Sequence, residues 1–191
     1  LPVLISETNE SELIIQDLAS RLGLDLLIRG EEEKEPQFAN DQYYLVRGNK
    51  KSHLQIGLKG KQKPILCNFT EWASNKKKSN LLRCMKGLPL DCSVVDATAG
   101  FGRDALELAT VSNTVVLIER VPWLHYLLQD GIKNSTEEYV LSLVRKFELI
   151  HSDARDFFAF KKNEADVVYL DPMFPNTGSA RAKKNIQALR D

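Results

Sequence analysis

The stretch Ser93-Val-Val-Asp-Ala-Thr-Ala-Gly-Phe-Gly-Arg-Asp104 decides the fold class of this chain. Its first four residues, Ser93–Asp96, are typical of a buried strand that ends in an acid, and a helix is expected over Arg103–Thr110. Gly100 and Gly102 lie between the two, where they allow a tight turn and a close approach of a ligand to the backbone. The stretch therefore predicts a strand, a turn and a helix, with a ligand site at the turn.

The same alternation continues toward the C-terminus. Further strands are expected over Val115–Glu119, Phe147–His151 and Asp166–Leu170. The helices between them are expected from Pro122, over Thr136–Arg145 and over Asp153–Phe158. Apolar strands separated by helices predict an α/β fold with a mostly parallel sheet covered on both faces. Right-handed crossovers then make it a doubly wound, Rossmann-like sheet.

Acidic residues follow all four expected strands, at the edge where such sheets bind ligands. Asp96, with Asp104 nearby, would repel a pyrophosphate, which argues against a dinucleotide-dependent dehydrogenase. The pair suits the ammonium and sulfonium groups of a cofactor such as S-adenosylmethionine (SAM). Glu119 could accept hydrogen bonds from ribose hydroxyls, as acids at this position do in nucleotide-binding sheets. Asp153 could accept from an adenine amino group, with a helix N-cap as its alternative role.

The fourth acid, Asp171, lies in the segment Val167-Val-Tyr-Leu-Asp-Pro-Met-Phe-Pro175. We expect this strand to lie beside the one that bears Asp96. Its two prolines restrict the loop to extended conformations, so the loop is stiff. Asp171 and the carbonyl of Pro172 could hold the two N–H donors of an exocyclic amine, while Phe174 could stack on the base. The segment therefore predicts the reaction side of the site, with these three residues as the catalytic group.

The N-terminal part, residues 1–75, predicts a small α+β lobe. Its expected strands are Val3–Ser6, Leu24–Ile28, Tyr43–Arg47, His53–Leu58 and Pro64–Asn68. Its expected helix ends at Gly23 and has an apolar face formed by Leu13, Ile14, Leu18 and Leu22. Residues 76–92 predict a linker and a short helix over Asn80–Lys86, and residues 93–191 the cofactor-binding domain. Because the chain stops within an expected helix, we expect this domain to be C-terminally incomplete.

The composition is that of a soluble globular protein, with 43% hydrophobic and 27% charged residues. We expect a cytoplasmic protein without a membrane segment or export leader, because no apolar stretch approaches the length of a bilayer span. No metal site is expected, because the three cysteines and three histidines show no ligand spacing. The 26 basic and 26 acidic residues balance, which leaves room only for local basic patches. The candidate RNA-binding residues, whose alternative is a solvated face, are Lys76, Lys77, Lys78, Arg181, Lys183 and Lys184.

Four motifs of this chain closely resemble the J-type bacterial 16S ribosomal RNA guanine-N2 methyltransferases. They are Val94-Val-Asp-Ala-Thr-Ala-Gly-Phe-Gly-Arg-Asp-Ala105, Leu117-Ile-Glu-Arg120, Leu149-Ile-His-Ser-Asp153 and Val168-Tyr-Leu-Asp-Pro-Met-Phe-Pro175. The resemblance covers about residues 80–191 and implies a class I methyltransferase domain over residues 93–191. It also implies methyl transfer from SAM, with S-adenosylhomocysteine as product, to 16S rRNA or the small ribosomal subunit.

The resemblance further implies which residues contact the cofactor. These are Arg103, Asp104, Glu119, Arg120, Asp153, Ala154 and Asp171, beside Asp96, Gly100 and Gly102 from the loop itself. Asp153 and Ala154 stand where the family has a Ser-Ser pair, so hydroxyl contacts are not expected there. Only Lys76–Lys78 stand in place of a longer Arg/Lys/Gly-rich stretch, and family members continue past residue 191 with more sheet strands.

Two alternatives to guanine-N2 methylation stay open at this point. An Asp-Pro-x-Phe loop suits any exocyclic amine, so a methyltransferase acting on adenine N6 is the first. The second is a non-catalytic RNA-binding factor for ribosome assembly, against which the intact acids Asp96, Glu119 and Asp171 argue. The sequence does not define the oligomeric state.

Overall fold

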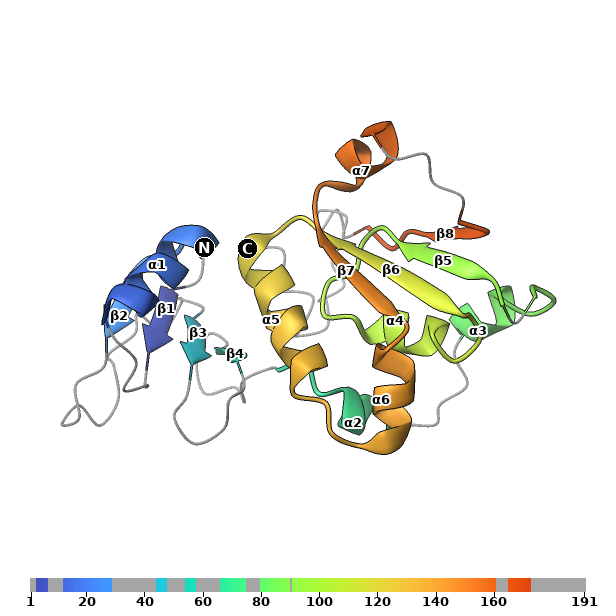
Figure 1. Cartoon of the computed structure of the whole chain (residues 1–191), viewed down its shortest axis with the longest axis horizontal. Helices are drawn as coiled ribbons and strands as arrows, with labels where there is room; N and C mark the ends of the chain where they lie inside the picture. The colour runs from blue at the N-terminus through green and yellow to red at the C-terminus, as the bar shows by residue number, and fades with distance from the viewer. Residues whose placement is uncertain are drawn as a thin grey trace, which may run out of the picture. The chain divides into compact units, whose positions relative to one another are not determined.

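The computed structural model divides the chain into two compact units (Figure 1). One comprises the described elements between Leu1 and Leu66, and the other is Cys67–Pro172. The described residues are 3–6, 12–28, 44–47, 54–57, 66–74, 80–89, 91–160 and 165–172. Within these ranges, no helix is both long and apolar enough to cross a membrane.

The first unit is a four-stranded sheet with one helix. Its strands are β1 (Val3–Ser6), β2 (Leu26–Ile28), β3 (Tyr44–Arg47) and β4 (Leu54–Gly57), in the order β2-β1-β3-β4. β1 runs parallel to β2 and β3, whereas β4 is antiparallel to β3. Helix α1 (Glu12–Leu22) ends before Gly23, whose φ of 65° suits a glycine. Four of the five strands predicted for this lobe and the helix are confirmed, with bounds that agree to within two residues.

The predicted apolar face of α1 is wrong at its N-terminal end. Leu13 and Ile14 are 76% and 55% exposed, whereas Ile15 is 2% exposed. The buried side chains are Ile15, Leu18, Ala19 and Leu22. These positions follow the i, i+3, i+4, i+7 spacing of one helix face, from which Leu13 points away and at whose edge Ile14 lies.

The second unit alternates helices and strands. Its helices are α2 (Phe69–Ser74), α3 (Asn80–Cys84), α4 (Arg103–Leu108), α5 (Pro122–Lys133), α6 (Glu138–Val144) and α7 (Ala154–Phe160). Its strands are β5 (Ser93–Asp96), β6 (Thr114–Glu119), β7 (Phe147–His151) and β8 (Val167–Tyr169). The strand–helix alternation predicted from Ser93 onward is confirmed, and every predicted bound agrees to within two residues.

The strands β5 to β8 form a parallel sheet in the order β7-β6-β5-β8. The predicted neighbourhood of β5 and β8 is confirmed, and the register aligns Asp96 with Tyr169. On the other side, Glu119 of β6 aligns with His151 of β7. Because all four strands are parallel, their carboxyl ends meet at one edge of the sheet.

Helices α2, α4 and α5 pack on one face of this sheet. Phe147 lies on that face and packs against Phe69 of α2, with ring centroids 6.0 Å apart. Tyr169 lies on the same face and bonds to Asp104 of α4. The apolar core on this side is fully buried and includes Val94, Leu108, Val115, Leu117, Leu127 and Leu128.

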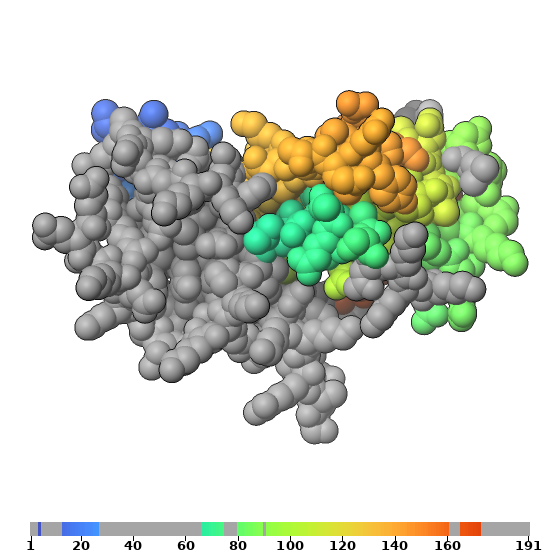
Figure 2. Space-filling view, turned by 90° about the horizontal axis from the view of Figure 1, so that it is seen from below, coloured from blue at the N-terminus to red at the C-terminus, as the bar shows by residue number. Residues whose placement is uncertain are grey.

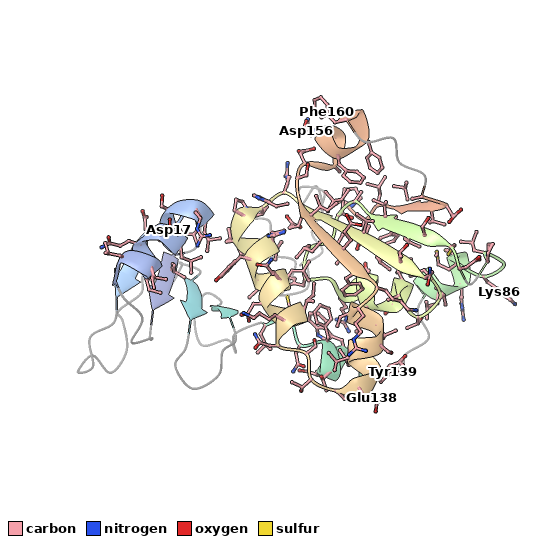
Figure 3. All side chains as sticks on the ribbon, in the orientation of Figure 1. Asp17, Lys86, Glu138, Tyr139, Asp156 and Phe160 are labelled. Atoms are coloured by element: carbon pink, nitrogen blue, oxygen red, sulfur yellow. The ribbon has the colours of Figure 1, made fainter. Side chains whose placement is uncertain are left out.

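The opposite face of the sheet is covered by α7. Phe157 of α7 packs with Val95 and Ile118, which alternate with the residues of the first face. Asp156 and Phe160 project outward from the same helix, and Phe160 is 90% exposed (Figure 3). The sheet is therefore the middle layer of a three-layer unit, as the sequence predicts.

The strand predicted over Pro64–Asn68 is wrong at its described residues. Leu66–Asn68 are irregular, and helix α2 follows them. Asn68 caps this helix, because its Oδ1 accepts from the backbone N–H of Glu71 at 3.1 Å. The Asn68 side-chain amide also donates to the Glu71 carboxylate at 3.3 Å, a bond between the two side chains beside the cap. α2 contacts α4 and α6, and Figure 2 shows it beside the orange helical segments.

Candidate cofactor and active site

The acid that ends β5, Asp96, is buried, with 1% exposure. The next turn of the chain wraps over it, so that the backbone N–H of Thr98 donates to Asp96 Oδ1 at 3.0 Å. Burial raises the pKa of Asp96 to about 7, and the Thr98 bond opposes this rise. The carboxylates of Asp104, Glu119 and Asp171 raise it further. These four acids therefore share one electrostatic neighbourhood at the carboxyl edge of the sheet.

The glycine loop between β5 and α4 has the backbone that only glycine adopts readily. Gly100 and Gly102 have φ values of 55° and 76°, in the left-handed region. A Cβ on Gly102 would lie 2.6 Å from Leu128 Cδ1, so this glycine also allows α5 to approach closely. A Cβ on Gly100 would meet only the Thr98 carbonyl, at 3.8 Å. Gly100 thus leaves an open backbone surface, as a loop that receives a ligand needs.

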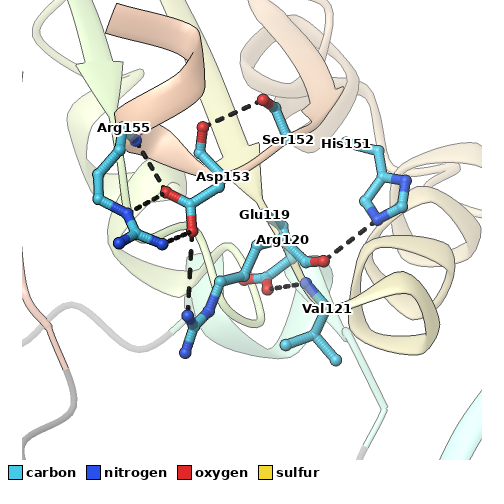
Figure 4. A network of polar contacts seen from close by, with 7 residues as sticks. All are labelled: Glu119, Arg120, Val121, His151, Ser152, Asp153 and Arg155. Atoms are coloured by element: carbon cyan, nitrogen blue, oxygen red, sulfur yellow. Dashed lines mark hydrogen bonds and ion pairs between the residues drawn. The ribbon is translucent and has the colours of Figure 1, made fainter. Parts of the chain in front are cut away.

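Glu119, at the end of β6, holds this loop in place. Its Oε2 accepts from the backbone N–H of Gly100 at 3.0 Å, and its Oε1 accepts from that of Val121 at 2.8 Å (Figure 4). The side chain is 7% exposed, and burial raises its pKa although both backbone bonds oppose the shift. The backbone N–H of Arg120 also lowers this pKa. A carboxylate can accept about four hydrogen bonds, so these backbone donors leave part of its capacity unused.

Asp153, after β7, is held mainly by Arg155. Its Oδ1 accepts from the Arg155 backbone N–H at 2.9 Å and from its Nε at 3.0 Å, and its Oδ2 accepts from Nη2 at 3.0 Å. Arg120 Nη1 lies 4.0 Å from the same carboxylate (Figure 4). The bonds from Arg155 lower the pKa of Asp153 to about 2. Asp153 therefore has the N-cap role that the sequence left as its alternative, and Ala154 begins α7.

The reaction-side acid, Asp171, is exposed just beyond β8. Its backbone N–H donates to Thr98 Oγ1 at 2.8 Å, so the glycine loop and the Asp-Pro loop are joined. Pro172 follows and is also exposed. Phe174, the Lys76–Lys78 run and the residues Arg181, Lys183 and Lys184 lie outside the described residues.

The remaining predicted cofactor residues lie at the start of α4. Arg103 is exposed, whereas the Asp104 carboxylate accepts from the Tyr169 hydroxyl at 2.8 Å. The pKa of the Tyr169 hydroxyl is raised mainly by its burial and secondly by its hydrogen bond to Asp104. The structure thus brings Asp96, Asp104, Glu119 and Asp171 together, and places Arg120 and Asp153 beside each other after the neighbouring strands.

Several side chains of this edge were not identified from sequence. Thr98 and Tyr169 contact residues 73 and 65 positions away in the chain, which no local pattern reveals. His125 and His151, which show no pattern in sequence, have ring centroids 5.1 Å apart. His151 Nε2 lies 3.2 Å from the Arg120 carbonyl (Figure 4). The pKa of His125 is lowered mainly by its burial and secondly by the charge of His151.

Among the described residues, no group of His, Cys, Asp and Glu side chains is arranged to hold a metal ion.

Together, the parallel sheet and its connections define a Rossmann-like α/β protein, with a group of acids at the edge where such sheets bind ligands. A family model described as "Putative SAM-dependent methyltransferase" matches residues 32–191, and the chain belongs to this family. A solved structure of a SAM-dependent methyltransferase from Neisseria gonorrhoeae shares the fold, with a TM-score of 0.64 and 21% identity. That match covers 90% of this chain and 69% of the gonococcal chain.

The relatives that carry the name ribosomal RNA small subunit methyltransferase J include the following two. The one from Chromobacterium violaceum is 33% identical over 167 residues, which cover 78% of this chain and 63% of the relative. The one from Laribacter hongkongensis is 44% identical over 100 residues, which cover 51% of this chain and 36% of the relative. The chain therefore spans less than two thirds of the length of either relative.

Proposed function

We propose that this protein transfers a methyl group from SAM to the exocyclic N2 amine of a guanine in 16S ribosomal RNA. The observation that carries the proposal is the convergence of Asp96, Asp104, Glu119 and Asp171 at one sheet edge. A dense negative potential attracts a cation and repels a pyrophosphate, so it favours SAM over a dinucleotide. Family membership and the names of the two relatives support the same reaction.

The residues of the edge fit the parts of SAM, which supplies an electrophilic methyl group when it is bound. The acidic group around Asp96 would face its ammonium and sulfonium groups, with Gly100 allowing the backbone to come close. Glu119 would accept from the ribose hydroxyls with the lone pairs that Gly100 and Val121 leave unused. Arg103, Asp104, Arg120, Asp153, Ala154 and Asp171 complete the proposed cofactor contacts.

Asp153 differs from the other acids of this edge in its hydrogen-bond partners. Because Arg155 occupies both of its oxygens, the carboxylate has less capacity left for an adenine amino group. We assign it the task of fixing Arg155 and Arg120 beside the cofactor edge, with an adenine contact through the capacity that remains. The backbone at Ala154, held by the start of α7, lies next to it.

On the reaction side, Asp171 would accept a hydrogen bond from the target amine and turn its lone pair toward the methyl group. The carbonyl of Pro172 would accept the second N–H, and Phe174 would stack on the base. An aryl amine is a weak nucleophile, so alignment and negative potential are the expected sources of rate. No strong base is needed before transfer, because the amine loses its proton only as it becomes cationic.

The substrate side includes residues beyond the described ranges. Lys76–Lys78 with Arg181, Lys183 and Lys184 would contact RNA phosphates of 16S rRNA or of the small subunit, in the cytoplasm. Among the described residues, the first unit would form an accessory lobe and Cys67–Pro172 the methyltransferase domain, so that α2 belongs to this domain and not to the lobe of residues 1–75 that the sequence predicts.

Titration calorimetry tests the cofactor half of the proposal. S-adenosylhomocysteine should bind and NAD should not. Asp96→Ala and Glu119→Ala should each weaken binding about 10- to 100-fold, which corresponds to roughly 1.5–3 kcal/mol for a lost charge-assisted bond. Glu138→Ala, which removes an exposed acid in the first turn of α6, is the matched control and should bind as the parent does. Equal affinities in all four proteins would remove the proposed cofactor site.

Mass spectrometry of nucleosides tests the substrate half. After incubation of 16S RNA or small subunits with the protein and SAM, the digest should contain N2-methylguanosine. N6-methyladenosine would instead identify an adenine methyltransferase with the same loop. RNA binding without any methylated product would indicate a non-catalytic assembly factor.

A further inference from the structure

The carboxyl ends of β5 and β8 are joined by more than the regular strand ladder. Within the ladder, the Ala97 N–H donates to the Tyr169 carbonyl at 3.0 Å. In a regular parallel ladder the next bond would run from the Asp171 N–H to the Ala97 carbonyl. Here the Asp171 N–H donates instead to the Thr98 hydroxyl oxygen, at 2.8 Å. A side chain thus takes the place of a backbone acceptor where the two strands end.

The bond from the Asp171 N–H to the Thr98 hydroxyl fixes the backbone immediately before Pro172. The proline ring already restricts the preceding residue, Asp171, to the extended region of φ and ψ. The bond to Thr98 holds the N–H of the same residue. Together, the two constraints determine the direction in which the Asp171 side chain leaves the sheet edge.

Thr98 is also fixed from its other side. Its backbone N–H donates to the buried carboxylate of Asp96, so the threonine cannot move without disturbing that contact. The Tyr169 hydroxyl of β8 donates to Asp104 at the start of α4, which adds a bond between the two elements that flank these loops. The bond that joins the loops themselves is the one from the Asp171 N–H to the Thr98 hydroxyl.

We infer that Thr98 is a positioning residue for methyl transfer: its hydroxyl sets Asp171 relative to the cofactor loop. The inference rests on the proposed function, in which Asp171 aligns the target amine. Misplacement by about 1 Å can lower the rate of such a reaction by about 100-fold. Loss of one neutral hydrogen bond at an exposed position should displace Asp171 less than that, so we expect a smaller effect on rate.

The test compares Thr98→Val, which keeps the shape and removes the acceptor, with Thr98→Ser, which keeps the acceptor. For Thr98→Val we expect kcat for RNA methylation to fall about tenfold, with S-adenosylhomocysteine affinity changed by less than about threefold. Thr98→Ser should restore kcat to within about threefold of the parent. Thr110→Val is the matched control, because the Thr110 hydroxyl donates to the Glu107 carbonyl just after α4, and it should leave kcat unchanged.

A second measurement needs no activity. Hydrogen exchange of the Asp171 amide, followed by NMR in ¹⁵N-labelled protein, should be slow in the parent and in Thr98→Ser and faster in Thr98→Val. Parent-like kcat in Thr98→Val, a Thr98→Ser variant as slow as Thr98→Val, or an unprotected Asp171 amide in the parent would each overturn the inference. If the parent itself does not methylate RNA, the proposed function fails, and the amide measurement still decides whether Thr98 holds Asp171.

Discussion

At the scale of single residues, the cofactor edge combines buried acids with a glycine loop. Asp96 and Glu119 are almost fully buried and accept hydrogen bonds from backbone N–H groups. They therefore hold the loop in place and also contribute negative charge to the site. Burial of a carboxyl favours its neutral form, and a cation beside it favours the charged form. The ionisation of Asp96 should therefore be linked to cofactor binding.

This linkage predicts a pH dependence of cofactor affinity. Since the pKa of Asp96 is raised to about 7, a ligand ammonium group that binds beside it must displace its proton at lower pH. We expect the affinity for S-adenosylhomocysteine to rise between about pH 6 and pH 8, with protons released on binding. Calorimetry in buffers of different ionisation enthalpy measures both quantities. In Asp96→Asn the rise should be much smaller, and a parent affinity that is flat over this range would contradict the linkage.

The same pKa shift has the opposite effect on the stability of the free protein. A carboxyl whose pKa is higher in the folded state than its usual 3.8 binds its proton more tightly when folded. Its contribution is therefore present at low pH and is lost as the pH rises through about 7. Denaturant unfolding should show that Asp96→Asn loses less stability than the parent between about pH 5 and pH 8. Equal losses in the two proteins would show that Asp96 is ionised throughout this range.

The two glycines of the loop should differ in their tolerance of a side chain. Both Gly102→Ala and Gly100→Ala place an alanine at a positive φ, which strains the backbone. Gly102→Ala also places a Cβ 2.6 Å from Leu128 Cδ1, whereas Gly100→Ala causes no such close contact. We expect losses of about 2–5 kcal/mol for Gly102→Ala and about 1–2 kcal/mol for Gly100→Ala in denaturant unfolding. Equal losses would show that close packing against α5 does not require this glycine.

Sequence reasoning located the acids and glycines of the edge because their position after a strand has a general physical meaning. It missed Thr98, Tyr169 and Arg155, whose roles depend on which strand ends become neighbours. Arg155 is the clearest example of a role that the sequence does not reveal. It stands only two residues from Asp153, and its bonds to both carboxylate oxygens reduce what Asp153 can bind.

At the scale of elements, the regular strands and helices of the second unit were predictable from hydrophobic periodicity, and α2 was not. The apolar residues of Pro64–Asn68 favour a strand in isolation, and this prediction ignored a helix-start signal. Asn68, followed three residues later by Glu71, is that signal. The buried face of α1 was also predicted from apolar residues alone. Leu13 and Ile14 are apolar but exposed, so this prediction was wrong at the N-terminal end of the helix.

The capping interaction of α2 gives a prediction of its own. Asn68→Ala removes the acceptor for the Glu71 N–H and should cost about 1 kcal/mol of stability, whereas Asn68→Ser keeps a capping oxygen and should lose less than about half of that. Denaturant unfolding monitored by circular dichroism measures both variants. A serine variant as unstable as the alanine variant would show that the cap does not stabilise α2.

At the scale of the whole molecule, the order β7-β6-β5-β8 explains why residues far apart in sequence form one site. β5 lies between β6 and β8, so the acids at or after the ends of these three strands, Asp96, Glu119 and Asp171, come together. Asp171 is 75 positions after Asp96 in the sequence. The sequence predicted parallel strands and the β5–β8 neighbourhood. The register that aligns Asp96 with Tyr169 required the structure.

The central claim is that this sheet edge aligns an exocyclic amine for methyl transfer through Asp171. Single-turnover transfer from labelled SAM to 16S RNA or small subunits, with the parent and Asp171→Asn, tests it most directly. The asparagine keeps the volume and one acceptor oxygen but presents an NH₂ group toward the amine. We expect the rate to fall at least ~100-fold, as the loss of one preorganised electrostatic contact typically causes. Asp156→Asn, at an exposed acid of α7, should keep the parent rate. Transfer by Asp171→Asn at the parent rate would contradict the account.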